Sequence, residues 1–114
     1  MTLAELLETQ AASQERRFGS LPDAWPTYER IDYVKTQVLG ALDELHEVLG
    51  ETGWKPWKSE GYGTVNRDAY LSEISDVLVF VTNLVIAVGG TPDELEGCLR
   101  ATQAKNQRRM KEGY

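Results

Sequence analysis

One segment of the chain, residues 66–88, constrains the fold more than any other because it is apolar on nearly every side of a helix. Its apolar surface is interrupted by a narrow line of polar residues, Glu73, Asp76 and Asn83, at steps of three and seven residues. A helix without a broad polar face needs protein neighbours around most of its circumference. The sequence therefore predicts a buried central helix that ends at Gly89-Gly90, in an all-α fold.

Three further helices are expected around this one. Residues 2–17 carry a leucine stripe, and residues 27–51 repeat apolar side chains at helical spacing. The clearest helix start is residues 91–94, a Thr-Pro-Asp-Glu capping box with proline at the first helical position, and this helix should run to about residue 112. Its inward side chains are expected to be Leu95, Cys98, Leu99 and Thr102. Together the four helices predict a single domain, residues 1–114, folded as a four-helix bundle that oligomerisation completes.

The balance of charge narrows the function classes. The chain has 12 lysines and arginines against 18 aspartates and glutamates, a formal charge of −6, which argues against a protein that neutralises a nucleic-acid polymer. Its single cysteine excludes an internal disulfide and suits a reducing compartment. No secretion signal is recognisable, and the longest near-apolar stretch, residues 77–88, is too short for a bilayer span of roughly 20 residues. We therefore expect a cytoplasmic protein without a membrane partner.

Two acidic pairs, Glu44 with Glu47 and Glu73 with Asp76, have the spacing of a metal site. Residues three apart on a helix lie about 60° apart, so each pair shares one face. The first pair alone fits a solvated surface equally well, but charges in an apolar helix must be paired or bound to a metal. Carboxylate oxygens are ligands of hard divalent cations, which also bind substrate phosphates. The four residues therefore predict a Mg²⁺ site between two helices, with Mn²⁺ as the alternative.

Basic and aromatic residues lie between the acidic pairs and at the end of the chain. The long connection of residues 52–65 contains two tryptophans and two lysines: Trp54, Lys55, Trp57 and Lys58. These side chains suit a stacked base and a phosphate, and the alternative is that the tryptophans only close the end of the bundle. The last helix ends in cations, including Lys105 and Arg109, which either bind phosphate or interact favourably with the helix dipole. His46 is expected at the surface, turned away from the glutamates on either side of it.

The order of these motifs resembles the all-α nucleoside triphosphate pyrophosphohydrolases, which comprise the MazG-like proteins and the dimeric, all-α dUTPases. The two acidic pairs match the Glu-x-x-Glu and Glu-x-x-Asp motifs of that group. The Trp-Lys-Pro-Trp-Lys segment at residues 54–58 is similar to a segment of the dimeric dUTPases, and Asn83, seven residues after Asp76, resembles the MazG-like pattern. The tail Asn106-x-x-Arg109-x-x-x-Gly113-Tyr114 is similar to the C-terminal phosphate-contacting motif of both.

The resemblance implies hydrolysis of a nucleoside triphosphate to the monophosphate and pyrophosphate by a homodimer or a homotetramer. Glu44, Glu47, Glu73 and Asp76 would hold Mg²⁺, and Glu47 would also orient or deprotonate the attacking water. Expected substrate contacts are Gln10, Gln14, Trp54, Lys55, Trp57, Lys58, Asn83, Lys105, Asn106, Arg109 and Tyr114. The base stays open, because the Trp-Lys segment favours dUTP or dCTP whereas the MazG-like features allow a broader or purine preference. A non-catalytic helical interaction module and a nucleotide sensor are the alternatives.

Overall fold

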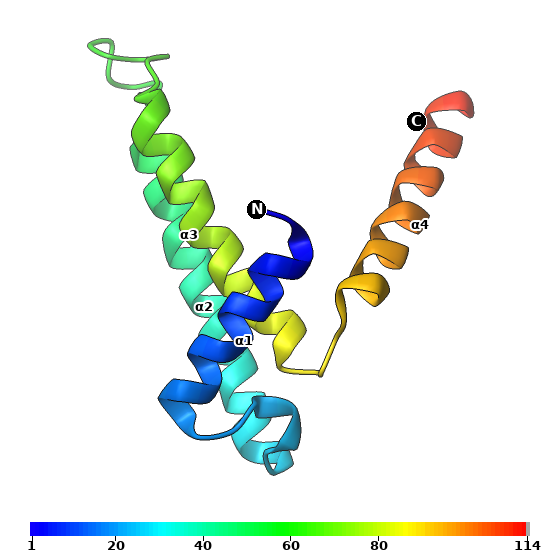
Figure 1. Ribbon diagram of the computed structural model, residues 1–114. Coiled ribbons are helices and arrows are strands. Elements are labelled where there is room, and N and C mark those ends of the chain that lie inside the picture. The colour runs from blue at the N-terminus through cyan, green and yellow to red at the C-terminus, as the bar shows by residue number, and fades with distance from the viewer. Residues whose placement is uncertain (114) are drawn as a thin grey trace.

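The computed structural model describes residues 1–113 and consists of helices joined by turns and loops (Figure 1). The four α-helices are α1 (Leu3–Phe18), α2 (Thr27–Gly50), α3 (Arg67–Ile86) and α4 (Pro92–Lys111), and a short 3-10 turn, η1 (Pro22–Ala24), precedes α2. Within this part of the chain, the only extended pairing shown is an isolated bridge between Thr52 and Val65. The prediction of an all-α chain with four helices is confirmed.

Local capping explains where α1 and α4 begin. The Thr2 hydroxyl accepts a hydrogen bond from the Glu5 amide (3.1 Å), which satisfies one of the free donors at the start of α1. Thr91 and Glu94 form the predicted capping box at the start of α4, with side-chain-to-backbone bonds of 3.0 and 3.2 Å. Asn66 stands at the N-cap position of α3, but its side chain makes no capping hydrogen bond. The capping box predicted at residues 91–94 is therefore confirmed.

α2 and α3 form an antiparallel hairpin, which is the main contact between helices in the chain (Figure 1). The two helices approach closely at Gly40, where an added Cβ would lie within 2.9 Å of three atoms of the Phe80 ring. Glycine is therefore required at this position for α3 to lie against α2 at its observed distance.

An ordered loop, residues 51–66, joins the two helices at the tip of the hairpin. The amide of Gly53 donates to the carbonyl of Thr64 (2.8 Å), and the amide of Asn66 donates to the carbonyl of Glu51 (2.9 Å). A Cβ on Gly53 would overlap the carbonyl of Gly61, so the close approach of the two sides of the loop requires glycine at this position. A long loop with this much internal bonding is typical of a functional connection.

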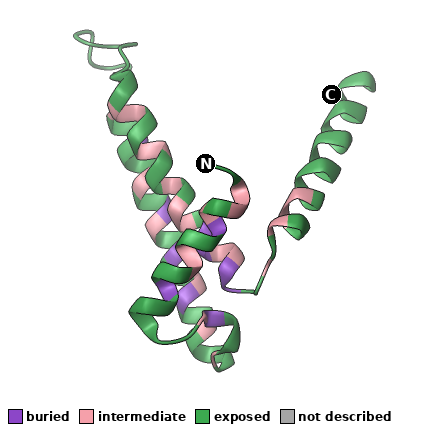
Figure 2. Cartoon of the chain, viewed as in Figure 1, coloured by how far each residue is buried: buried purple, intermediate pink, exposed green. Residues whose placement is uncertain are grey.

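The core lies where α1 crosses the hairpin (Figure 2). Buried apolar side chains come from all three helices and include Leu7, Tyr33, Ala41, Val48 and Ile86. The rings of Phe18, Trp25 and Tyr33 pack edge to face with centroid distances of 5.3–6.0 Å, and they hold the end of α1 against the start of α2.

Two expectations about burial are wrong for the single chain. α3 is not enclosed, since its buried residues are Thr82, Asn83 and Ile86 and its Leu71 and Leu78 are about half exposed. α4 has no buried residue and stands away from the hairpin, so that Cys98 and Leu99 are exposed rather than inward (Figures 1 and 2).

The overall dimensions agree with this open arrangement. The radius of gyration is 17.6 Å, whereas a compact chain of 114 residues has about 13 Å. The reason is that a helix packs against a neighbour only where an apolar face is presented to it, and the single chain offers α4 only a short contact with α1. The helices match the bundle prediction, but one chain does not close the bundle.

α3 also has the length and composition of a helix that could cross a membrane, with a mean hydropathy of 1.5 and 17% of that window buried. Core helices of non-membrane proteins meet the same criterion. Glu73 and Asp76 lie within it, and ionised side chains are costly inside a bilayer. The helix is therefore only weak support for a membrane span.

Candidate active site

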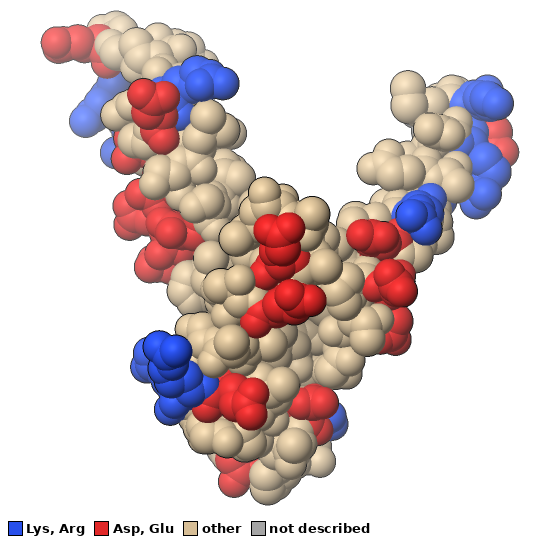
Figure 3. Space-filling view, in the orientation of Figure 1, with Lys and Arg blue, Asp and Glu red and all other residues tan. Residues whose placement is uncertain are grey.

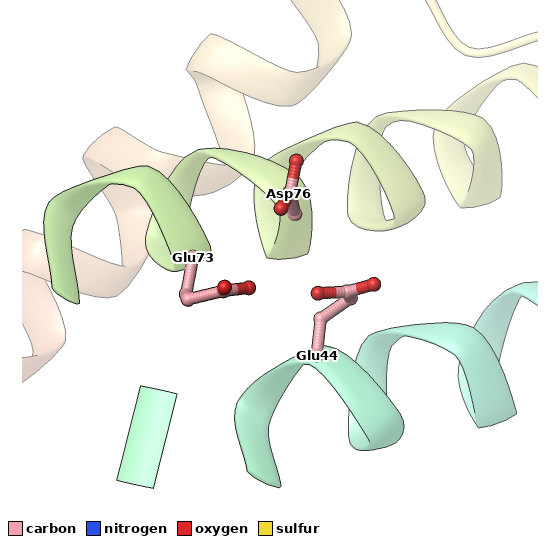
Figure 4. Close-up of side chains that lie close together, drawn as sticks. All are labelled: Glu44, Glu73 and Asp76. Carbon is pink, nitrogen blue, oxygen red and sulfur yellow. The ribbon is translucent and has the colours of Figure 1, made fainter. Parts of the chain in front are cut away.

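Three carboxylates from α2 and α3 meet in the hairpin. Glu44 and Glu73 extend their side chains toward one another, and Asp76 lies one turn further along α3 (Figure 4). One oxygen from each of the three residues lies within 4.8 Å of the others. Glu44 and Glu73 are half-buried and Asp76 is exposed, so the cluster lies at the edge of the hairpin rather than in the enclosed core expected from the sequence. The structure thus brings together residues separated by about 30 positions, as the two acidic motifs predict.

The electrostatic environment of Glu73 is uniformly unfavourable to its charge. Partial desolvation raises the pKa of Glu73 above its ordinary value, and a side-chain hydrogen bond with Glu44 raises it further. The charges of Glu44, Asp76 and Glu47 act in the same direction. The charges that raise the pKa of Glu73 all belong to neighbouring carboxylates, and a bound cation would relieve their repulsion.

Glu47, the predicted catalytic base and fourth metal ligand, is outside the group of three. It is exposed and lies one turn beyond Glu44 toward the loop, on the same side of α2. Its charge nevertheless contributes, as the weakest of the causes, to the raised pKa of Glu73. Its role as ligand or base stays a prediction.

A chain of side-chain amides lies further along the same helical faces. Gln10 of α1 donates to the amide oxygen of Asn83 (3.0 Å), and Asn83 donates in turn to Gln37 of α2 (2.9 Å). Nearby, the hydroxyl of Tyr33 donates to Gln14 (2.7 Å) and both residues are buried. Gln10, Gln14 and Asn83 were expected to contact substrate, and the structure shows them bonded to one another or to α2.

Sequence reasoning missed two members of this network, Gln37 and Tyr33. Gln37 lies seven residues before Glu44, and Tyr33 lies eleven residues before it, so each lies within about 20° of Glu44 around α2. The available signal was a glutamine on the face that otherwise carries Ala41 and Val48 toward the core. Asn83 is placed on α3 by the same rule, seven residues after Asp76.

The loop residues line a pocket that is separate from the carboxylate cluster. Trp54 packs edge to face against Trp57 (5.7 Å between centroids), and the ammonium of Lys55 lies 5.8 Å from the centre of the Trp54 ring. Trp54, Lys55 and Lys58 line a pocket of about 360 Å³, whereas Trp57 is 70% exposed. None of the four acidic-motif residues lines this pocket. In one chain, the loop lysines and the carboxylates are therefore not brought together.

The predicted contacts from the tail lie still further away. Lys105, Asn106 and Arg109 are exposed on the outer half of α4, and Figure 3 shows lysine and arginine side chains gathered at that end, apart from the hairpin. Tyr114 lies outside the described residues. The single chain therefore does not place the tail motif beside the carboxylates.

The fold and the cluster together define a class: an all-α protein with an acidic site in a helical hairpin. A family model described as dUTPase matches residues 2–114, and the chain belongs to this dUTPase family. Membership confirms the resemblance to the all-α nucleoside triphosphate pyrophosphohydrolases and implies a hydrolase that acts on nucleoside triphosphates. Comparisons with curated proteins and with solved structures gave no match.

Proposed function

We propose that this protein hydrolyses a deoxynucleoside triphosphate, with dUTP the first candidate, to the monophosphate and pyrophosphate in a Mg²⁺-dependent reaction. The observation that carries the proposal is the meeting of Glu44, Glu73 and Asp76 from two helices within 4.8 Å, in a chain that matches the dUTPase family along nearly its whole length. Water adds to a phosphorus, the anhydride bond between the α- and β-phosphates breaks, and the two products leave.

The donor set fits a hard divalent cation. All three groups offer carboxylate oxygen, the ligand type that Mg²⁺ and Mn²⁺ prefer. Ligands at about 2.1 Å from a Mg²⁺ ion lie up to about 4.2 Å apart, so the observed spread of up to 4.8 Å requires only small side-chain rotations. The raised pKa of Glu73 has the same implication, because a cation removes the repulsion that raises it.

The roles of the residues follow from their positions. Glu44, Glu73 and Asp76 would hold the cation, which when bound would supply positive charge to the phosphates and lower the pKa of the attacking water. Glu47, one turn away and exposed, accepts or orients the proton of the attacking water. Its position at the rim leaves it free to do so without also closing the metal cluster.

The arrangement along α2 gives the substrate a direction. Gln37 lies seven residues from Glu44, which is about 10 Å along the helix and on the same face. The loop lies at the other end, past Glu47. If the phosphates lie at the carboxylate cluster, the base points toward the side-chain amides of Gln10, Gln37 and Asn83. To bind the edge of a base, these amides must give up the hydrogen bonds that they make with one another. Trp54 and Trp57 lie at the opposite end, which disfavours their stacking on the base in the same chain.

A second chain is proposed to complete the site. Exposed large apolar side chains line the outer faces of the hairpin, among them Leu39 (64%) and Leu42 (56%) on α2 and Leu78 (50%) on α3. Large apolar side chains exposed on both helices are typical of a protein interface. In a cytoplasmic homodimer or homotetramer, Lys105 and Arg109 on the projecting α4 would bind phosphates at the site of the partner chain.

Pyrophosphate release from each dNTP and NTP, with millimolar Mg²⁺ and with EDTA, tests the proposed reaction. We expect release from at least one deoxynucleotide, abolished by EDTA and reduced about 100-fold or more by Asp76→Asn. Asp68→Asn is the matched control, because Asp68 is an exposed aspartate on the first turn of the same helix. No release from any nucleotide would favour a sensor or an interaction module, and full activity in Asp76→Asn would refute this site.

Subunit sharing is tested by mixing two inactive variants, Asp76→Asn and Arg109→Gln. If Arg109 acts across the interface, random exchange of subunits should restore about a quarter of the wild-type activity, because half of the dimers are mixed and each holds one intact site. If the tail serves the carboxylates of its own chain, the mixed dimer gains no intact site and activity stays low.

A further inference from the structure

We infer that the pocket at the junction of α1, η1 and α2 is a second ligand site, one that binds a small alkylated ammonium cation such as choline. The pocket has a volume of about 350 Å³, within the range of small-molecule sites. Four aromatic residues and two carboxylates line it: Phe18, Trp25, Tyr28, Tyr33, Glu29 and Asp32. This site is additional to the proposed reaction and does not depend on it.

Three of the aromatic rings form a corner beside the pocket. The ring centres of Phe18, Trp25 and Tyr33 lie 5.3–6.0 Å apart, and their planes are inclined by 78–88° to one another. The electron-rich face of such a ring attracts a cation within about 6 Å of its centre. The Phe18 ring already shows this property, because the guanidinium carbon of Arg17 lies 5.4 Å from its centre. Arg17 does not line the pocket, so the pocket side of the corner is open to a different cation.

The charge of the lining has the sign that a cation requires. Glu29 and Asp32 are both exposed and lie three residues apart, on one side of α2. Among the described residues, the lining contains these two carboxylates and no lysine or arginine. Aromatic rings beside negative charge are the usual surroundings of a bound quaternary ammonium group. The methyl groups of such a cation contact the rings directly, whereas a primary ammonium would need acceptors for three N–H donors.

The walls of the pocket are fixed before any ligand arrives. The indole N–H of Trp25 donates to the Ser20 hydroxyl (2.9 Å), and the backbone amide of Trp25 donates to the carbonyl of Pro22 (3.0 Å). Tyr33 is buried and its hydroxyl donates to Gln14, so this residue offers the pocket its ring rather than its hydroxyl. A site formed in advance loses little conformational entropy on binding.

The pocket is separate from the carboxylate cluster. Asp32 lies twelve residues before Glu44, which is about 18 Å along α2 and about 120° around it. None of the three clustered carboxylates lines the pocket. Gln37 links the two regions, because it lines the pocket and also accepts the hydrogen bond from Asn83. A neutral base that reached the pocket would therefore compete with the cation.

The test is a titration of the whole protein with choline in EDTA at constant ionic strength, followed by the indole N–H signals of its three tryptophans in ¹H–¹⁵N NMR spectra. The Trp25 signal should shift and saturate with a Kd of about 1 mM, while those of Trp54 and Trp57 in the loop stay in place as internal controls. The neutral analogue in which a tert-butyl group replaces the trimethylammonium group should produce no saturable shift. Ethanolamine, a primary amine, should bind at least about fivefold more weakly than choline.

Charge and aromatic surface are tested by separate variants. Asp32→Asn should raise the Kd for choline about fivefold, because it removes one of the two carboxylates. Tyr28→Ala should raise it by a similar factor, whereas Tyr28→Phe, which keeps the ring, should not. The Tyr28 side chain is 83% exposed, so both changes should leave the chain folded. Asp43→Asn is the matched control, since Asp43 is an exposed aspartate of α2 outside the pocket.

Four results would each overturn the inference, whatever the result for pyrophosphate release. The first is no shift of the Trp25 signal at about 20 mM choline. The second is equal binding of the neutral analogue, which would mean that the pocket selects shape alone. An equal loss of affinity in Asp43→Asn would indicate a general attraction to an acidic chain. Displacement of choline by deoxyuridine would make the pocket part of the nucleotide site.

Discussion

Asn83 joins three helices, and its removal gives a sharp test of the amide network. Asn83→Ala deletes the bonds to Gln10 and Gln37, each contributing about 1 kcal/mol to stability. It also leaves the buried acceptor of Gln37 without a partner, which costs about 1–3 kcal/mol more. We expect a loss of about 3–5 kcal/mol in the free energy of unfolding. For a chain of 114 residues this corresponds to a fall of about 12–21 °C in Tm.

Urea and thermal unfolding, followed by circular dichroism at one fixed protein concentration, measure this loss. The matched control is Gln107→Ala, which removes an amide from the exposed face of α4 and should change stability by less than about 0.5 kcal/mol. A double-mutant cycle with Gln37→Ala isolates the shared bond, and its coupling energy should exceed about 0.5 kcal/mol.

The result that would refute this reasoning is a stable Asn83→Ala protein with a raised KM. It would mean that the amides are held ready for the base and contribute little to the fold. A loss of stability with a coupling energy near zero between Asn83 and Gln37 would instead mean that a cavity formed beneath α1 is the cause.

Three further outcomes follow from the same structure. The pKa of Glu73 is raised in the folded state, so the folded protein holds this proton more tightly than the unfolded chain, and stability without metal should fall as the pH rises above 4.5 toward the raised pKa. Tm measured in EDTA from pH 4.5 to 8 should show this fall. A flat profile, or the same fall in Glu73→Gln, would contradict the prediction. Gly40→Ala should lower stability by about 1–3 kcal/mol in urea unfolding because its methyl group meets the Phe80 ring, whereas Gly97→Ala, with open space around it, should not. Burial raises the pKa of Tyr33 to about 12, so stability should fall between about pH 10 and 12, where the unfolded chain ionises this phenol and the folded chain does not. Phenolate absorbance should show one tyrosine that titrates late and that is missing in Tyr33→Phe. Ionisation of all five tyrosines near pH 10 would argue against the prediction.

The sequence was most informative where the determinants are local. The capping box at Thr91 depends on residues within one helical turn, and it is found in the structure. The meeting of Glu44 with Glu73 was also predictable, because two amphipathic helices joined by one loop pack as an antiparallel hairpin. The exposure of α3 in the single chain was not predictable. An apolar helix needs neighbours, but its sequence does not say whether they come from the same chain.

The amide network was beyond the sequence for a different reason. Its longest-range bond joins positions 10 and 83, and this bond forms only because α1 packs against α3. The spacing of residues along a helix predicts that Gln37 lies on the same face of α2 as Glu44. It does not predict that Gln10 of α1 lies next to Asn83. The separation of the loop lysines from the carboxylates was likewise hidden, since sequence proximity to Glu47 reveals nothing of the side of α2 to which the loop folds.

The faces of α2 explain how a protein with so much exposed apolar surface can keep an open site. Gln37, Gly40, Glu44 and Val48 share the side of the helix that meets α3. Leu42 and Leu49 lie about 140–160° around the helix from Glu44, on the outer side. A second chain that covers these leucines therefore buries apolar area without displacing the carboxylates. The same pair of helices can thus provide an interface on one side and, on the other, an acidic site that is open to solvent.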